Sequence, residues 1–261
     1  ADYSVGEKNV EVATRTLNKC RERVLGVPVD DISESEFEES VLNLLEGEGV
    51  RTVLFLSLWD LLKARRNSEF RACVGNAAQV IPVSKTILKG ARFLHKSISH
   101  RYYPFDFVIR FIRVLEMKGL SLYLLGGKPP YLQQAEKNIR QTFPGLKLVG
   151  RYPGYYPHPV EEDILLAMRK ASPHCILLGP GLRGKERWIR RNQGSLPSSI
   201  VIYSPLTFDI ISGKRIRPNR ETFEKGYDFF HDLVRKPWRV FRGVFYLYFL
   251  LLLLVYRIRK L

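Results

Sequence analysis

Apolar residues fall into short continuous runs along the chain, and the segments between these runs carry apolar residues at helical spacing. Continuous apolar runs are typical of strands buried on both faces of a sheet, whereas the i, i+3, i+4 spacing is typical of helices. One expected strand begins at Val27, and the others lie within 51–58, 79–84, 120–127, 146–156, 174–181 and 198–204. Expected helices cover 36–49, 59–77, 85–98, 105–119, 129–145, 161–173 and 184–194.

This regular alternation predicts the fold class. Strands that alternate with helices form a parallel sheet with helices on both faces, so we expect an α/β, Rossmann-like fold. The pattern changes near residue 119 and again after residue 213. We therefore divide the chain into an N-terminal α/β half (1–119), a second Rossmann-like half (120–213) and a C-terminal appendage (214–261).

The charge balance calls for an anionic partner. Of the 261 residues, 42 are Lys or Arg and 26 are Asp or Glu, which gives a net charge of +16. Nucleic acid, a phosphate-bearing substrate or an anionic membrane would each suit this excess. No zinc-finger spacing or RNA-binding aromatic motif is present, so we expect no nucleic-acid partner. The three cysteines are widely spaced, which argues against a disulfide framework and a CxxC metal site.

Half of the excess charge lies in the appendage. Residues 214–261 hold twelve Lys/Arg and four Asp/Glu, and a basic-aromatic stretch at 234–243 precedes the apolar run 244–256. That run has thirteen residues, short of the roughly 20 that a membrane-spanning helix needs. Aromatic and basic residues at both ends favour a helix lying in an anionic membrane surface. The alternative is a C-terminal helix buried in the core. The N-terminus has no apolar signal segment, so we expect the body at the cytoplasmic face of the membrane.

Glycine-bearing loops follow three of the expected strands. Gly126 and Gly127, Gly154, and Gly181 lie where ligands bind in open parallel sheets, at the carboxyl ends of the strands. Glycine lets backbone N–H groups approach a phosphate, and Lys185 lies nearby. A nucleotide-phosphate site is one interpretation; tight turns between strands and helices are the other.

Several segments, taken in order, resemble the WecG/TagA/CpsF family of glycosyltransferases over about residues 26–242. The matching stretches are GVPVDDISESEFEESV, LSLWDLLKARRNSEFRA, HRYYPFD, LYLLGGKP, FPGLKLVGRYPGYY, GPGLRGKERWI and the segment that begins FDIISGKRIRPNRE. No single motif is decisive, but the collinear series is specific.

The resemblance implies an inverting transfer of a hexose or hexosamine, of the N-acetylmannosamine type, from a UDP-sugar to a polyprenyl-diphosphate-linked sugar. It implies cell-surface polysaccharide synthesis, no metal or other cofactor, a membrane-docked appendage and a homo-oligomer as a candidate assembly. The N-terminal half would serve the acceptor and the second half the UDP-sugar. The UDP-sugar-binding residues expected from loops and resemblance together are Gly126, Gly127, Gly154, Tyr155, Gly181, Lys185, Glu186 and Asp209. Those expected at the acceptor diphosphate are Arg101, Ser57, Arg239 and Arg242.

The chain departs from the family where a base is needed. The acceptor hydroxyl requires a proton acceptor, which the family supplies as an Asp in a Pro-Asp-Gly motif. Val83 stands at that position, and Pro104 replaces a glycine in HRYYPFD. Glu186 and Asp106 are candidates for a relocated base, and Lys185 is a candidate for stabilising the leaving group.

Two readings therefore stay open. The chain is either a divergent transferase or an inactive relative that acts as a membrane-bound binding protein. Smaller ambiguities also remain at two residues. Asp209 matches a family Asp near the site but also suits a helix N-cap, and Tyr155 can stack on a ligand or simply pack.

Overall fold

The structure is a computed structural model that describes residues 21–217 and 242–259, with the side chains of 242 and 243 left out. Its strands are β1 (Arg21–Val24), β2 (Val27–Asp30), β3 (Val50–Leu56), β4 (Gln79–Pro82), β5 (Ser121–Leu125), β6 (Lys147–Tyr152), β7 (Cys175–Leu178) and β8 (Ser199–Tyr203). Its helices are α2 (Phe37–Glu46), α3 (Leu58–Arg66), α4 (Ser68–Gly75), α5 (Lys85–Phe93), α6 (Pro104–Met117), α7 (Pro129–Thr142), η1 (His158–Val160), α8 (Glu161–Ala171), α9 (Arg187–Arg191), α10 (Pro205–Ile211) and α13 (Arg242–Ile258).

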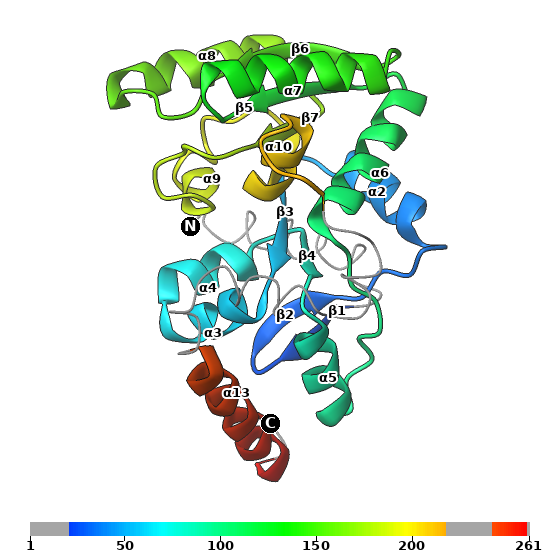
Figure 1. Ribbon diagram of the computed structural model, residues 1–261, viewed down its shortest axis with the longest axis vertical. Coiled ribbons are helices and arrows are strands. Elements are labelled where there is room, and N and C mark those ends of the chain that lie inside the picture. The colour runs from blue at the N-terminus through cyan, green and yellow to red at the C-terminus, as the bar shows by residue number, and fades with distance from the viewer. Residues whose placement is uncertain (1–20, 218–241, 260–261) are drawn as a thin grey trace, which may run out of the picture.

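A parallel six-stranded sheet forms the centre of the fold. Its strand order is β4-β3-β8-β7-β5-β6, and every neighbouring pair is parallel. Successive residues of β5 face opposite sides: Leu122 and Leu124 pack in one core cluster, while Tyr123 and Leu125 pack in another. Helices α2, α6, α7 and α10 supply residues to the first cluster, and α8 and α9 to the second. The expected α/β fold with helices on both faces is confirmed (Figure 1).

One sheet runs through both halves of the chain, because β3 pairs with β8. In that pair Val50 lies opposite Ser199 and Val53 lies opposite Ile202. The carboxyl ends of β3, β4, β5, β7 and β8 therefore meet along one edge of the sheet. The boundaries drawn at 119 and 213 stay predictions.

Three segments differ from their expected form. The helix expected over 59–77 is two helices, α3 and α4, because Asn67 leaves the helical region at φ −116° and its side chain caps α4. The helix expected over 85–98 ends at Phe93, and His95 has a left-handed φ of 56°. The strand at Val27 is half of an antiparallel hairpin with β1, closed by Leu25 and Gly26, both at positive φ.

The C-terminal helix α13 packs against the N-terminal half. Phe249, Leu252 and Leu253 are buried in a core cluster with residues of α3, α4, α5 and the hairpin. The rings of Phe245 and Trp59 meet edge to face, with centroids 4.7 Å apart. The Tyr256 hydroxyl donates to the carbonyl of Leu25. One side of this helix is thus part of the core, as the buried-helix alternative expected.

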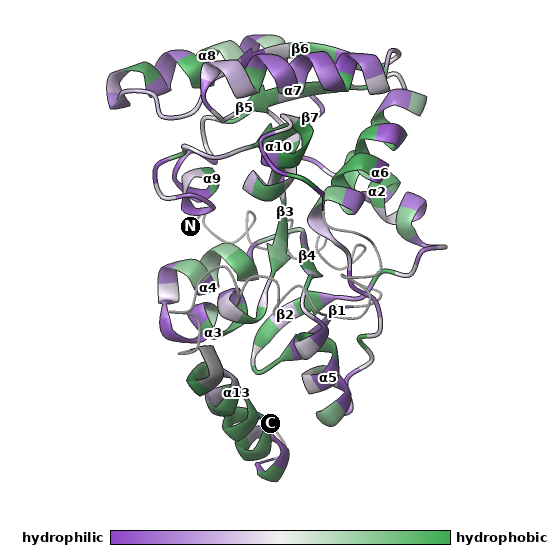
Figure 2. Ribbon diagram, viewed as in Figure 1, coloured by the Kyte–Doolittle hydropathy of each residue, from purple (hydrophilic) through white to green (hydrophobic). Residues whose placement is uncertain are grey.

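The opposite side of α13 is an apolar stripe exposed to solvent. Its members follow each other at helical spacing and are 56–72% exposed: Val244, Leu247, Leu251, Leu254 and Ile258. Figure 2 shows the apolar character of this helix beyond the body of the molecule. Within the part of the chain that the structure describes, no helix has both the length and the apolarity needed to cross a bilayer.

Candidate active site

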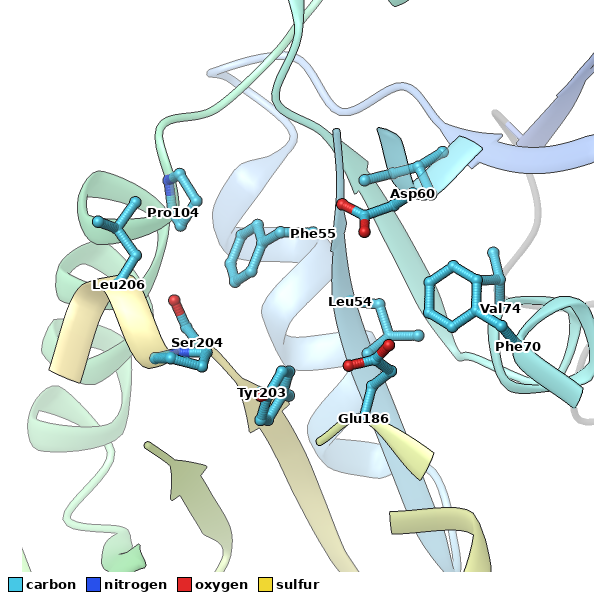
Figure 3. A pocket seen from close by; sticks show the side chains of 12 residues that line it. Leu54, Phe55, Asp60, Phe70, Val74, Pro104, Glu186, Tyr203, Ser204 and Leu206 are labelled. Atoms are coloured by element: carbon cyan, nitrogen blue, oxygen red, sulfur yellow. The ribbon is translucent and has the colours of Figure 1, made fainter. Parts of the chain in front are cut away.

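A cavity of about 200 Å³ lies at the carboxyl ends of β3 and β8, where the two halves of the chain meet. Most of its lining is apolar and includes Phe55, Phe70 and Pro104. Two carboxylates, Asp60 and Glu186, also line it and lie on the same side of the cavity, across from Ser204 (Figure 3). This position is where open parallel sheets bind ligands.

A capping box places Asp60 in the cavity. Ser57 directly follows β3 and is the N-cap of α3, so its hydroxyl oxygen accepts from the Asp60 amide. In return the Ser57 amide (3.0 Å) and hydroxyl (2.5 Å) both donate to Oδ2 of Asp60. The sequence Ser-Leu-Trp-Asp thus satisfies two helix-end groups and fixes the aspartate side chain.

Burial raises the pKa of the Asp60 carboxyl above its usual range, because ionising a carboxylate away from water is unfavourable. The two hydrogen bonds from Ser57 act in the opposite direction, and the negative charge of Glu186 raises the pKa further. Burial, followed by the charge of Glu186, also raises the pKa of the Tyr203 hydroxyl, which lines the same cavity. The ionised form of Asp60 is therefore less favourable than that of an exposed aspartate, as expected of a group that exchanges protons.

Lys63 neutralises part of the acidic wall. Its Nζ donates to Oε1 of Glu186 at 2.5 Å, and the Glu186 side chain is only 10% exposed. Lys63 lies one turn after Asp60 on α3, whereas Glu186 precedes α9. A second ion pair, from Arg187 to Glu69 at 2.8 Å, also joins α9 to α4. The α9 segment is thereby fixed over the cavity by two cation–carboxylate contacts.

The glycine loops pack against one another through their backbones. The amide of Gly127 donates to the carbonyl of Pro180, and that of Gly154 donates to Gly127. A Cβ at Gly126, which has φ +143°, would lie 2.6 Å from Gly179 Cα. These contacts support the interpretation of the loops as tight turns. The amides of Gly127 and Gly154 already donate to backbone carbonyls of the protein. Phosphate binding by these loops stays a prediction.

The second half contributes three further expected residues around these loops. A Cβ at Gly181 would meet the ring of Tyr155, and the Tyr155 amide donates to the Gly181 carbonyl. Tyr155 and Lys185 both have left-handed backbones, with φ of 60° and 55°. The Tyr155 side chain is 61% exposed, and Lys185 is exposed and does not line the cavity.

Val83 lies beside the cavity-forming end of β3. Its amide donates to the carbonyl of Leu56 at 3.0 Å, so the ends of β3 and β4 are adjacent. Its own carbonyl accepts from Nη1 of Arg101 at 3.0 Å. Arg101 thus contacts the backbone of the position where the family's carboxylate is missing, and its role at the acceptor diphosphate stays a prediction.

Two expected carboxylates are paired with cations outside the cavity lining. Asp106 contacts Arg217 at 2.6 Å, and Asp209 contacts Lys214 at 3.3 Å. Asp209 lies inside α10, whose N-cap is Ser204, so the N-cap reading of Asp209 is wrong. That reading failed because the serine after β8 caps the helix first.

Comparison with known proteins places the chain among these transferases. The family model described as "Glycosyl transferase WecG/TagA/CpsF family" matches residues 22–261. The chain belongs to this family. It is also 22% identical to an N-acetylglucosaminyldiphosphoundecaprenol N-acetyl-beta-D-mannosaminyltransferase of Bacillus subtilis, over 61% of this chain and 62% of that relative. The chain thus spans about three fifths of the length of that relative.

Within the WecG/TagA/CpsF fold, the structure brings some expected site residues together and separates others. Ser57, Arg101 and Glu186 lie at or beside the cavity, whereas Asp106 and Asp209 lie outside its lining. Arg239 falls outside the described residues, and for Arg242 only its place as the first residue of α13 is described. The binding roles of all these residues stay predictions.

Asp60 is not among the site residues expected from the resemblance to the family. Its signal in the sequence is the Ser-x-x-Asp capping box directly after a buried strand, which also has a purely local explanation. No three His, Cys, Asp or Glu side chains among the residues described here are placed to hold a metal ion. Transfer without a metal stays a prediction.

Proposed function

We propose that this chain is an inverting glycosyltransferase that acts in the synthesis of a cell-surface polysaccharide. It transfers an N-acetylmannosamine-type sugar from a UDP-sugar to a polyprenyl-diphosphate-linked sugar. Family membership and the name of the Bacillus subtilis relative support the substrate classes. The observation that carries the proposal is the cavity at the carboxyl ends of β3 and β8, because the carboxylates of Asp60 and Glu186 line it.

We further propose that α13 docks on an anionic membrane, at its cytoplasmic face, where a lipid-linked acceptor lies. One side of the helix is held by the core through Phe249, and the other side presents the stripe of Val244, Leu247, Leu251, Leu254 and Ile258. An amphipathic helix fixed in this way suits a position parallel to the bilayer surface. Juxtamembrane Lys and Arg add about 1 kcal/mol each on an anionic leaflet.

The transfer is tested with purified full-length chain. UDP-N-acetylmannosamine is incubated with a short-chain polyprenyl-diphosphate N-acetylglucosamine, and the product and released UDP are measured by mass spectrometry. We expect a product heavier by one N-acetylhexosamine and a matching amount of UDP. Binding of the donor with no transfer to this or related acceptors would instead support an inactive binding protein. Val83→Asp, which restores the family's carboxylate, is measured beside the wild type.

Membrane docking is tested with vesicles of phosphatidylglycerol and phosphatidylcholine. Deleting the helix would also remove Phe249 from the core, so substitutions confined to the stripe are the cleaner change. We expect Leu247→Ser/Leu251→Ser/Leu254→Ser to reduce sedimentation with anionic vesicles. Met117→Ser, at another exposed apolar position (65% exposed), serves as the control. Equal binding of the stripe variant and the control would contradict docking by this helix.

A further inference from the structure

We propose that Asp60 is the general base of the transfer and takes over the role of the carboxylate that Val83 replaces. The inference rests on the proposed function and names the group that activates the acceptor. Asp60 lines the cavity at the end of β3, next to the β4 end where Val83 lies. The base has thus moved from one strand end to its neighbour and still faces the same edge of the sheet.

The two carboxylate oxygens of Asp60 have different surroundings. Oδ2 accepts both hydrogen bonds from Ser57, which fixes the rotamer of the side chain. Oδ1 accepts no hydrogen bond from residues 21–217 or 242–259, and we assign it to the acceptor hydroxyl. A base with one oxygen anchored and the other directed to the substrate needs little reorganisation to accept a proton.

Other carboxylates are less suited to this role. Glu186 lines the cavity, but its Oε1 is held by Lys63 at 2.5 Å. Asp106 and Asp209 are paired with Arg217 and Lys214 and do not line the cavity. Asp60 is the cavity carboxylate that no lysine or arginine contacts as an ion pair among the described residues.

The proposed step is a direct displacement at the anomeric carbon of the donor sugar. An acceptor hydroxyl gives its proton to Oδ1 of Asp60 while its oxygen forms a bond to the anomeric carbon of the donor sugar. The bond from that carbon to the diphosphate oxygen breaks, and its electron pair leaves with UDP. Attack from the side opposite the leaving group inverts the anomeric centre. Asp60 returns its proton to water after the product leaves.

The groups around Asp60 make its carboxylate a stronger base than an exposed aspartate. Burial raises its pKa, Glu186 from the α9 segment raises it further, and Ser57 and Lys63 from its own helix lower it. Tyr203 of β8 faces the same cavity and is neutral, since its own pKa is raised. A higher pKa makes a carboxylate a stronger base, provided that the group is still ionised at working pH. Glu186 is thus a positioning residue that acts through Asp60.

The experiment compares Asp60→Asn with a matched control in the transfer assay. Asn keeps an oxygen that can accept from the Ser57 amide but cannot take a proton. We expect kcat to fall by about 10²–10⁴-fold, with the thermal shift produced by UDP unchanged. Glu36→Gln is the control, because Ser33 and Glu36 form a similar serine–carboxylate contact at the start of α2 (2.5 Å), outside the cavity. That control should keep wild-type kcat.

A pH profile separates proton transfer from a structural role. In the wild type, kcat/KM should fall on the acidic side as Asp60 is protonated. In Glu186→Gln that acidic limb should move to lower pH, because the charge that raises the pKa of Asp60 is gone. A purely structural effect of Glu186 would lower the rate without moving the limb.

The outcomes distinguish this inference from the proposed function. If the wild type transfers sugar but Asp60→Asn keeps kcat within about 10-fold of it, the base assignment alone is overturned. The same holds if the wild type and Glu186→Gln have the same acidic limb. A wild-type chain that releases no UDP with any acceptor overturns both the function and the base.

Discussion

The packing of α13 on the body gives a quantitative prediction about stability. Phe249 is 1% exposed and approaches α5 so closely that a Cβ at Gly90 would lie 2.6 Å from its Cζ. Leu251, two residues further along the same helix, is 62% exposed. The two residues lie two positions apart on the same helix and differ strongly in burial.

Truncating a buried Phe to Ala removes its transfer free energy and leaves a cavity, which together cost about 3–5 kcal/mol. For a chain of this size, each kcal/mol corresponds to about 2–4 °C in Tm, so Phe249→Ala should lower Tm by about 6–20 °C. Leu251→Ala removes little buried surface and should change stability by less than about 0.5 kcal/mol.

Both variants are measured by thermal and urea denaturation without lipid, followed by circular dichroism. Limited proteolysis checks whether α13 separates before the body unfolds, because Phe249→Ala should then be cleaved near its C-terminus sooner than the wild type. Equal Tm values for Phe249→Ala and Leu251→Ala, together with equal cleavage rates, would refute the packing of α13 on α5.

Three further predictions follow from single positions. Gly126→Ala should be clearly destabilising in chemical denaturation, because φ is +143° and a Cβ would meet Gly179 Cα at 2.6 Å. Gly194→Ala is the control, because a Cβ there would meet nothing within 4 Å. Similar free energies of unfolding for the two variants would contradict the loop packing. Burial raises the pKa of the Cys175 thiol, so a Cys20→Ser variant should react with a thiol reagent at Cys175 only after unfolding, as mass mapping would reveal. The raised pKa of Asp60 means that the native state binds its proton more tightly than the unfolded state, so its ionisation weakens stability as pH rises above about 4. Asp60→Asn should therefore gain stability relative to the wild type as pH rises above about 4, and a difference that is constant with pH would contradict this sign.

The sequence was sufficient to predict the elements of the sheet but not their neighbours. Most strands of the central sheet are short apolar runs, which are recognisable locally, whereas the edge strand β6 (KLVGRY) is partly exposed. The pairing of β3 with β8 joins Val50 to Ser199, and no local pattern encodes a contact across so much of the chain. The cavity lies at that junction, so its residues could not be grouped from the sequence.

Local signals also had meanings that only the structure separates. Asn67 followed by Ser68 is an N-cap signal inside an apparently continuous helix, and it divides α3 from α4. Glycines after β5 and β7 indicate a ligand loop, but they also have a packing reason: a Cβ at Gly126 would meet the Gly179 backbone, and a Cβ at Gly179 would meet the Phe208 ring. Asp60 was not recognised as a site residue from the sequence, because its capping role in α3 already explains an aspartate at that position.

Helix α3 connects the two surfaces on which the proposals depend. Trp59 contacts Phe245 of α13, and the next residue, Asp60, lines the cavity. The first turn of α3 is fixed on one side by the capping box and on the other by the C-terminal helix. If α13 lies on a bilayer as proposed, the cavity is held at a set distance from the lipid by rigid elements rather than by a loop. A lipid-linked acceptor would then reach Asp60 from a fixed direction, which is what selective activation of one hydroxyl requires.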